Sequence, residues 1–429
     1  MATNTVTTSA TGLNKLWRKV QGEVAEGLNY NCEEWQQLND LENFDIDWSF
    51  REITFPVRIN KGVGAGSIVE GGFETVPSSP NLEECTINWV QFNKRFTASL
   101  MAFYVSTKDP GAALKSQLVF QAMDAIDVLA AQFSDYFYGY STAVLAITDT
   151  DVSGTTATLT IKNGYGSSTI TDKTYISRLF RVGEYVALVA AGSDALIDAN
   201  AIGKITAITA ATPSIAVTFI GSVSSYTTDG IRIVKANAGG TANLDQTITG
   251  TDLNRGVVGL LDMSLSTTIQ NISSSSVPDW TPAYTDTTGG RLSGLRIHRG
   301  RDEIANYGGA KTGLKMILDQ GVYRDMIGLQ QAALRFNDPF ALELDADIKA
   351  KGLEFFKSRR TPPGYAWLMA KESFYRMNLL PKPTQGSIQW KDGQKLVDQN
   401  GLIFSIDWPV QMVTTNRRNI AVWSGLSTQ

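Results

Sequence analysis

A single stretch of 31 residues constrains the fold more than any other part of the sequence. Residues 109–139 read DPGAALKSQLVFQAMDAIDVLAAQFSDYFYG, with Asp109 placed to cap a helix, Pro110 at its first position and Gly139 placed to end it. A helix of this length measures roughly 40 Å, whereas the mean helix of a globular protein has about 11–12 residues. A helix of this length determines the shape of the protein, and none of its residues indicates an active site. Its apolar side chains recur at helical spacing: Leu114, Leu118, Ala122, Ile126, Leu129, Phe133 and Phe137.

Two extended segments precede this helix. Residues 52–60 alternate between apolar and polar side chains, and Pro56 favours an edge strand or a bulge because it cannot donate to a ladder. Residues 86–96 have long polar side chains on both faces, so we expect a strand that is exposed on both sides and pairs with the first. A glycine-bearing tip, KGVGAGSIVEGGFETVPSSPN, joins them. Because isolated two-stranded hairpins are marginal in water, we expect another chain to cover this loop; the alternative is a hairpin packed on its own domain.

The N-terminal 50 residues resemble an arm. Residues 1–12 are rich in Thr, Ser and Ala, and residues 13–28 have the mixed charge of a short surface helix. The acidic segment 32–47 carries Trp35, Leu38, Leu41 and Phe44, which need a neighbouring surface. That surface is either another subunit or the core of the same chain.

The region after the long helix changes character twice. Residues 142–238 are β-rich and dominated by short polar side chains, with strands expected at 157–162, 185–189, 205–208, 215–219 and 230–234. Their spacing predicts a small antiparallel barrel or sandwich inserted in the chain. The remainder alternates helices (290–307 and 321–336) with strands (314–318, 353–356, 366–369, 404–408 and 420–423), which indicates a mixed α/β layer. In the first of these helices we expect Leu292, Leu295, Ile304 and Ala305 on the apolar side, weakened by Gly294 and Gly300.

Composition limits the classes of function. The formal net charge is −4, so the overall charge of the chain does not indicate a nucleic-acid-binding protein. A local basic surface that binds nucleic acid is still compatible with this charge. Cys32 and Cys85 are the only cysteines, so we do not expect a fold that is stabilised by disulfide bonds. The N-terminus has no secretory signal pattern and no run of 18 apolar residues predicts a membrane span.

The search for chemistry gives little. His298 is the only histidine and stands among Arg296, Arg299 and Arg301, so no catalytic triad is expected. The sequence GVGAGS at 62–67 lacks both the dinucleotide and the Walker pattern and reads as a loop tip. The acid pairs at 45/47 and 345/347 are typical of surface loops. We therefore expect no catalytic, cofactor-binding or metal site and no enzymatic activity. The doublets Arg359-Arg360 and Arg417-Arg418 are either solvated or contact another subunit or packaged nucleic acid.

The order of elements resembles the major capsid proteins of tailed bacteriophages (Caudoviricetes), which have the Hong Kong 97-like fold. Local phrases are similar too: GVVGLLD at 256–262, VPDW at 277–280, LKMILDQGVYRDMIGLQ from 314, and LEFFKSRRTPPGYAWLMAKESFY at 353–375. The resemblance implies an α+β fold with an N-terminal arm (1–50), an extended two-stranded loop (51–100), a spine helix with peripheral domain (101–144), an inserted β-barrel-like domain (145–240), and an axial domain with the rest of the peripheral domain (241–429). The inserted domain departs from the minimal pattern of the family.

The resemblance also implies a function. The chain is expected to form hexamers and pentamers of an icosahedral virion shell around double-stranded DNA, assembled in the host cytoplasm, with scaffolding, portal and decoration proteins as further partners and no membrane. An encapsulin-like nanocompartment shell is the alternative within the same fold, and an enzyme or carbohydrate-binding protein with an inserted barrel is the alternative outside it. The residues expected at subunit contacts are Ile53, Phe55, Arg58, Lys61, Glu70, Trp89, Arg95, Arg359 and Arg360.

Overall fold

The computed structural model describes residues 33–40, 47–48, 52–59, 82–99, 112–191, 195–209, 213–227, 229–236, 256–307, 313–334, 353–378, 389–395 and 401–428. The chain divides into two compact units. One consists of Met1–Leu41, Trp89–Ser134 and Arg376–Met412, and the other of Glu42–Asn88, Asp135–Tyr375 and Val413–Gln429. The boundary falls three times within a regular element: once in the long helix, once in the strand Phe374–Asn378 and once in the strand Gly401–Thr414.

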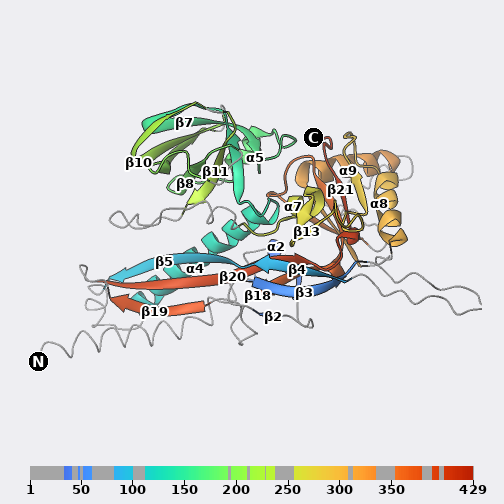
Figure 1. Ribbon diagram of the computed structural model, residues 1–429, viewed down its shortest axis with the longest axis horizontal. Helices are drawn as coiled ribbons and strands as arrows, with labels where there is room; N and C mark the ends of the chain where they lie inside the picture. Colours follow the sequence, from blue (N-terminus) through green and yellow to red (C-terminus); the bar gives the residue numbers. More distant parts are fainter. Residues whose placement is uncertain are drawn as a thin grey trace, which may run out of the picture. The chain divides into compact units, whose positions relative to one another are not determined.

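The first unit is built on a long antiparallel ladder. Strand β5 (Val90–Ser99) pairs with β20 (Gly401–Thr414) from Val90 opposite Val410 to Ser99 opposite Gly401. Strand β19 (Gln389–Lys395) pairs with β20, and the same sheet takes in β18 (Phe374–Asn378) and β1 (Asn39–Asp40), near the short helix α2 (Glu33–Gln36) in sequence. The sheet has an aromatic core, because the Trp408 ring lies 6.0 Å from the Phe92 ring and 5.3 Å from that of Phe133 on α4. Figure 1 shows α4 running along this sheet.

The expected long helix is present as α4 (Ala112–Phe137). Five of the seven apolar positions named from the sequence are buried, namely Ala122, Ile126, Leu129, Phe133 and Phe137. The other two, Leu114 and Leu118, belong to the part of α4 whose side chains are not described, and the expected cap Asp109 lies outside the described residues. The helix ends as expected, since the Gly139 amide donates to the Tyr136 carbonyl at 3.0 Å.

The two-stranded loop differs from its prediction. Strand β3 (Glu52–Arg58) pairs with β2 (Asp47–Trp48) and with β4 (Leu82–Asn88), and the expected second strand is in fact divided at Trp89 into β4 and β5. The expectation of exposure on both faces is wrong for β4, because Phe55, Val57, Cys85 and Ile87 form a buried face. Because these small or apolar side chains occupy alternate positions, they lie on one face of the strands and bury it, although long polar side chains stand between them in sequence. The loop tip between Asn60 and Asn81 lies outside the described residues.

The base of this hairpin is held by a second, tighter hairpin. Strands β12 (Thr268–Ile269) and β13 (Ile272–Ser273) are joined by Gln270 and Asn271, whose φ angles of 54° and 65° are those of a primed turn. The Thr86 amide of β4 donates to the Gln270 carbonyl at 3.1 Å. The base of the loop is therefore stabilised within its own unit.

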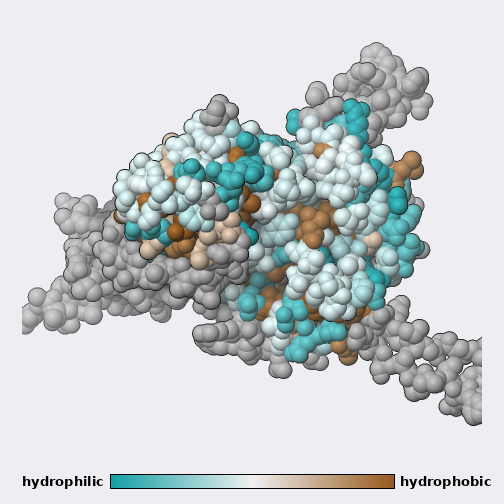
Figure 2. Space-filling view, turned by 45° about the horizontal axis from the view of Figure 1, so that its top comes forward, coloured by the Kyte–Doolittle hydropathy of each residue, from teal (hydrophilic) through white to brown (hydrophobic). Residues whose placement is uncertain are grey.

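The inserted region is a closed barrel with the strand order β10-β7-β6-β11-β8-β9. All of its strand pairings are antiparallel. Its interior is apolar, whereas Thr155, Thr156, Thr158 and Thr160 of β7 are exposed, and Figure 2 shows the barrel at the upper left mainly in pale and teal. The sequence prediction omitted β6, an apolar run that follows the helix without a turn signal. The strands are β6 (Val144–Thr148), β7 (Val152–Gly164), β8 (Tyr185–Val189), β9 (Ile202–Thr209), β10 (Ser214–Tyr226) and β11 (Ile231–Ala236), with α5 (Lys173–Ser177) between β7 and β8.

The glycine–leucine phrase at 256–262 packs against the chain that follows α4. A Cβ on Gly259 would lie 2.4 Å from the Gly139 carbonyl oxygen, and one on Gly256 would lie 2.7 Å from the Ala143 amide nitrogen. Helix α7 (Leu260–Leu265) starts at this contact, and the Asp262 carboxylate accepts the Ser141 amide at 3.1 Å. Glycine is required here because backbone meets backbone.

A mixed sheet forms the remaining core, in the order β14-β21-β17-β15-β16. Its strands are β14 (Tyr284–Asp286), β21 (Ile420–Trp423), β17 (Ala366–Ala370), β15 (Leu314–Asp319) and β16 (Leu353–Ser358). Helices α8 (Gly294–Asn306) and α9 (Gln320–Leu334) contact it, as Figure 1 shows. Leu292 and Ile304 are buried as expected, but Leu295 is 82% exposed and Ile297 takes its place. Gly300 lets α8 approach the Trp423 ring, which a Cβ would meet at 2.6 Å.

A buried ion pair fixes the start of α8. The Asp286 carboxylate accepts the Thr288 amide at 3.0 Å and the Thr288 hydroxyl at 2.6 Å, and it pairs with Arg296 at 2.8 Å. Burial opposes ionisation of this carboxyl, but these donors together lower the pKa of Asp286 to about 2. Arg296, one of the cations around His298 in sequence, is thus a structural residue.

Candidate functional site

The described residues contain no group of three or more His, Cys, Asp or Glu side chains that could hold a metal ion. His298 lies on the exposed side of α8. Among the described helices, none has the length and hydropathy needed to cross a membrane. Burial, with a smaller contribution from Glu83, raises the pKa of the Cys85 thiol to about 12, so this thiol is neutral and unreactive at ordinary pH.

The residues expected at subunit contacts fall into three groups. Arg95 on β5 and Arg359 after β16 are exposed, and Trp89 is half-buried. Phe55 and Arg360 make contacts inside the chain, since Phe55 is 1% exposed and Arg360 pairs with Asp135. Nothing is described of the side chains of Ile53 and Arg58, which lie on β3, and Lys61 and Glu70 lie outside the described residues.

The doublet Arg417-Arg418 has a structural role. Helix α7 ends at Leu265, and the carbonyls of its last turn have no partner within the helix. The buried Arg417 guanidinium donates to the Met263 carbonyl at 2.8 Å, to the Trp280 carbonyl at 2.9 Å and to the Ser266 carbonyl. Burial lowers the pKa of Arg417 to about 10, which leaves it charged at neutral pH.

Arg418 lies at the surface beside it. Its guanidinium pairs with Asp279 and stacks on the Tyr307 ring, 4.1 Å from the ring centroid. Both arginines of this doublet are therefore engaged within the chain, and neither of the two readings offered by the sequence, a solvated face or a contact with another molecule, describes Arg417.

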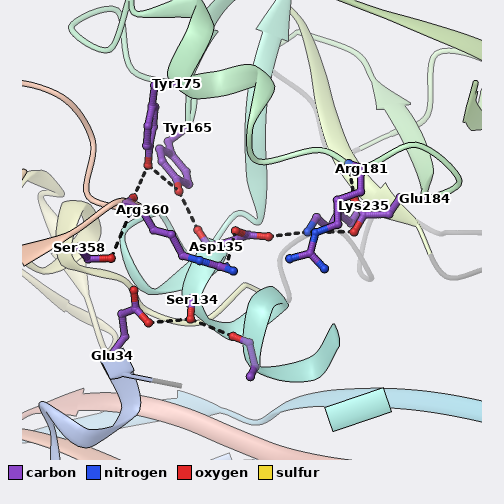
Figure 3. A network of polar contacts seen from close by, with 11 residues as sticks. Glu34, Ser134, Asp135, Tyr165, Tyr175, Arg181, Glu184, Lys235, Ser358 and Arg360 are labelled. Atoms are coloured by element: carbon purple, nitrogen blue, oxygen red, sulfur yellow. Dashed lines mark hydrogen bonds and ion pairs between the residues drawn. The ribbon is translucent and has the colours of Figure 1, made fainter. Parts of the chain in front are cut away.

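The other doublet belongs to a polar network around Asp135, the residue in the last turn of α4 that Figure 3 places at its centre. Asp135 is 4% exposed, and each of its carboxylate oxygens has its own cation. Oδ1 lies 3.0 Å from an Arg360 guanidinium nitrogen and Oδ2 lies 2.7 Å from the Lys235 ammonium group of β11. Lys235 also lies 3.7 Å from Glu184. A buried carboxylate requires such pairing, because an isolated charge in this position would be strongly destabilising.

Two tyrosines complete the network. The Tyr165 hydroxyl donates to the Asp135 backbone carbonyl at 2.8 Å, and the Tyr175 hydroxyl donates to the Arg360 carbonyl. Tyr175 is held by its helix, α5, whose N-cap Asp172 accepts the Thr174 amide at 2.9 Å. Burial raises the pKa of Tyr175 well above its usual value, so the phenol remains a neutral donor.

A pocket of about 490 Å³ opens beside this network. Its lining includes four arginines, Arg178, Arg181, Arg359 and Arg360, together with Asp135 and Tyr175. Arg178, Arg181 and Arg359 are exposed. The sequence reading found the Arg359-Arg360 doublet but missed the others, because Arg178 and Arg181 are single cations 180 residues away and only the fold brings them together.

Comparisons with known proteins indicate the fold. No protein-family model matches the sequence, and a search of curated proteins gives no significant match. Among solved structures, a chain of the Cyanophage A-1(L) capsid asymmetric unit is similar at 12% identity and a TM-score of 0.50, over 91% of this chain and 90% of that one. A chain from the capsid of a native GTA particle is similar at 9% identity and a TM-score of 0.42, over 92% and 90% of the two chains. The virus-like particle from Pyrococcus furiosus gives 8% identity and a TM-score of 0.36, over 95% and 98%.

The first of these likenesses carries the assignment. It spans nearly the whole of both chains and concerns the backbone arrangement, since so low an identity says nothing of individual residues. The chain therefore has an α+β fold of the kind found in a phage capsid, in agreement with the resemblance seen in the sequence.

Proposed function

We propose that this chain is a major capsid protein, a structural subunit without enzymatic activity that assembles into the shell of a tailed phage. The observation that carries the proposal is the similarity to the Cyanophage A-1(L) capsid over 91% of this chain.

In this proposal α4 serves as the spine helix, the barrel β6–β11 as an inserted domain, and the mixed sheet with α8 and α9 as the axial domain. Hexamers and pentamers of the chain form a closed shell around double-stranded DNA, which makes the chain a component of the virion. Rings and closed shells follow when one surface of a subunit binds a different surface of the next.

The loop between β3 and β4 supplies the contact between neighbours. Its base is stabilised within the chain, so what needs a neighbour is the distal part, residues 59–81. Leu82, the first residue of β4, is 59% exposed and would be covered by the adjacent subunit. Of the contact residues expected from the sequence, Arg95 and Arg359 are exposed and Trp89 is half-buried, and we retain them as contacts; Ile53, Arg58, Lys61 and Glu70, whose side chains are not described, stay predictions.

Deletion of residues 62–81 tests this arrangement. We expect the deleted chain to keep the circular dichroism spectrum and melting temperature of the parent but to form no regular particles. A matched control replaces the same residues with a glycine–serine segment of equal length. This control distinguishes the effect of shortening the loop from the effect of removing its specific side-chain contacts. The purified parent chain should form closed particles that protect DNA from nuclease. Normal particles from the deletion would contradict the role of the loop, and particles without DNA from phage-infected cells would contradict the role in packaging.

A further inference from the structure

Within the described part of the chain, the arginine pocket has more cationic than anionic side chains. Each carboxylate oxygen of Asp135 already pairs with a cation, Oδ1 with Arg360 and Oδ2 with Lys235, so the single negative charge of Asp135 is shared by these two groups. Glu184 is engaged as well, because one oxygen lies near Lys235 and the other accepts the backbone amide of Arg181 at 3.1 Å.

Three arginines in the pocket have no carboxylate partner in the described part of the chain: Arg178, Arg181 and Arg359. Counted over the described residues, the pocket and its network contain five cations and two carboxylates, a formal excess of three positive charges. Guanidinium groups bind oxyanions through paired donors, and several around one concavity favour a ligand with more than one anionic group.

The walls of the pocket are fixed in position. Arg178 caps the C-terminus of α5, its amide donating to the Tyr175 carbonyl at 2.9 Å. The Arg360 amide donates to the Ser358 hydroxyl at 3.1 Å. Figure 3 shows Arg360 and Tyr175 joined through the network around Asp135. These contacts fix the backbone from which the arginine side chains of the pocket extend.

The shape of the pocket and the net charge of the chain favour carboxylate side chains of a second copy, over DNA phosphates, as the anions that bind in the pocket. A DNA duplex presents its phosphates on a convex, stiff rod, which a concavity of about 490 Å³ cannot enclose, whereas acidic side chains can enter it. The chain has 42 acidic against 38 basic residues, so a second copy offers an excess of carboxylates. In an assembly of many copies these carboxylates are present at high effective concentration.

We propose that the arginine pocket binds carboxylate side chains of an acidic segment from a second copy of this chain, and that this contact contributes to assembly. The inference rests on the proposed function in requiring a second copy. It joins Arg359, which the sequence already suggested as a subunit contact, to Arg178 and Arg181 in one site, and neither the sequence nor the likeness of fold assigns a role to those two arginines.

The test uses the full-length chain with the double charge reversal Arg178→Glu/Arg181→Glu. Both side chains are exposed, so the variant should keep the parent's circular dichroism spectrum and melting temperature. The matched control is Lys204→Glu, which reverses an exposed charge on β9 outside the pocket lining. We expect the control to form particles like the parent and the double variant to form few or none.

A binding experiment on the unassembled chain identifies the ligand class. Labelled hexaglutamate should bind the parent and the control, and the double variant should weaken binding on the order of tenfold or more. A map of assembled particles from electron cryomicroscopy should show acidic side chains of a neighbouring copy in the pocket.

Several outcomes would overturn the inference. These are particles of normal yield from the double variant, no saturable binding of hexaglutamate, tighter arginine-dependent binding of a 12-base-pair duplex than of hexaglutamate, or nucleic acid in the pocket in the map. A parent chain that forms no particles would instead refute the proposed function. Arginine-dependent hexaglutamate binding in that case would still support an acidic protein partner.

Discussion

Replacement of the buried Arg417 by Met should strongly destabilise the second unit. The guanidinium donates to the backbone carbonyls of Met263, Ser266 and Trp280 and thereby joins the end of α7 to the turn before β21. A methionine fills a similar volume but leaves these buried acceptors without a donor.

The magnitude follows from the three bonds. Hydrogen bonds to a charged group contribute about 1.5–3 kcal/mol each, and the gain is reduced by the cost of burying the guanidinium. That cost is real here, because burial lowers the pKa of Arg417 to about 10. We expect a net loss of about 3–5 kcal/mol in the free energy of unfolding, or a drop on the order of 10 °C in melting temperature.

The neighbouring residue provides the matched control. Arg418→Met removes a surface ion pair with Asp279 and a stacking contact with Tyr307, which together should contribute about 1 kcal/mol. Differential scanning calorimetry measures both variants, and hydrogen exchange of α7 amides locates the effect. Equal melting temperatures for the two variants, or an Arg417→Met protein as stable as the parent, would refute the view that Arg417 holds the end of α7.

Three further predictions concern single residues. Cys85 should resist Ellman's reagent in the native Cys32→Ser protein at pH 8, because burial raises the pKa of its thiol to about 12. The same thiol should react fully when the protein is unfolded in urea. Rapid labelling of the native protein would show that the base of the β3–β4 hairpin is open to solvent. Asp286 has a lowered pKa of about 2, so its ionised form stabilises the fold at pH values above about 4 and this contribution disappears as the pH falls through about 2. The difference in unfolding free energy between the parent and Asp286→Asn, on the order of 2 kcal/mol at pH 6, should therefore shrink at low pH, and a constant difference would argue against the ion pair. Gly259→Ala should lower the melting temperature by several degrees through its contact with the Gly139 carbonyl, and a silent substitution would exclude that close approach.

Much of the fold could be predicted where one periodic signal dominates. The buried positions Ala122, Ile126, Leu129 and Phe133 of α4 follow from helical spacing alone. Strand β8 was predicted with its observed bounds because turn residues flank a short apolar run. In such segments the local sequence and the tertiary environment favour the same structure.

The errors arise where tertiary contacts decide. Residues 86–96 carry no break signal at Trp89, yet the pairing partner changes there from β3 to β20, a strand more than 300 residues away. Leu295 has the right spacing for an apolar face, but the helix is rotated so that Gly300 meets Trp423.

The basic pocket could not have been predicted for a related reason. Arg178 and Arg181 have no pattern of their own, and a site assembled from α5, β11 and the turn after β16 leaves no local signature. The charge doublets gave an incomplete signal, since they identified Arg359 as a surface cation but could not show that Arg417 is buried.

The central claim is that this chain is a shell subunit, and electron microscopy of the purified full-length chain across a range of concentrations tests it most directly. We predict closed particles of uniform diameter, with each subunit's loop 59–81 lying on its neighbour. A chain that stays monomeric at every concentration, with this loop folded on its own surface, would contradict the claim.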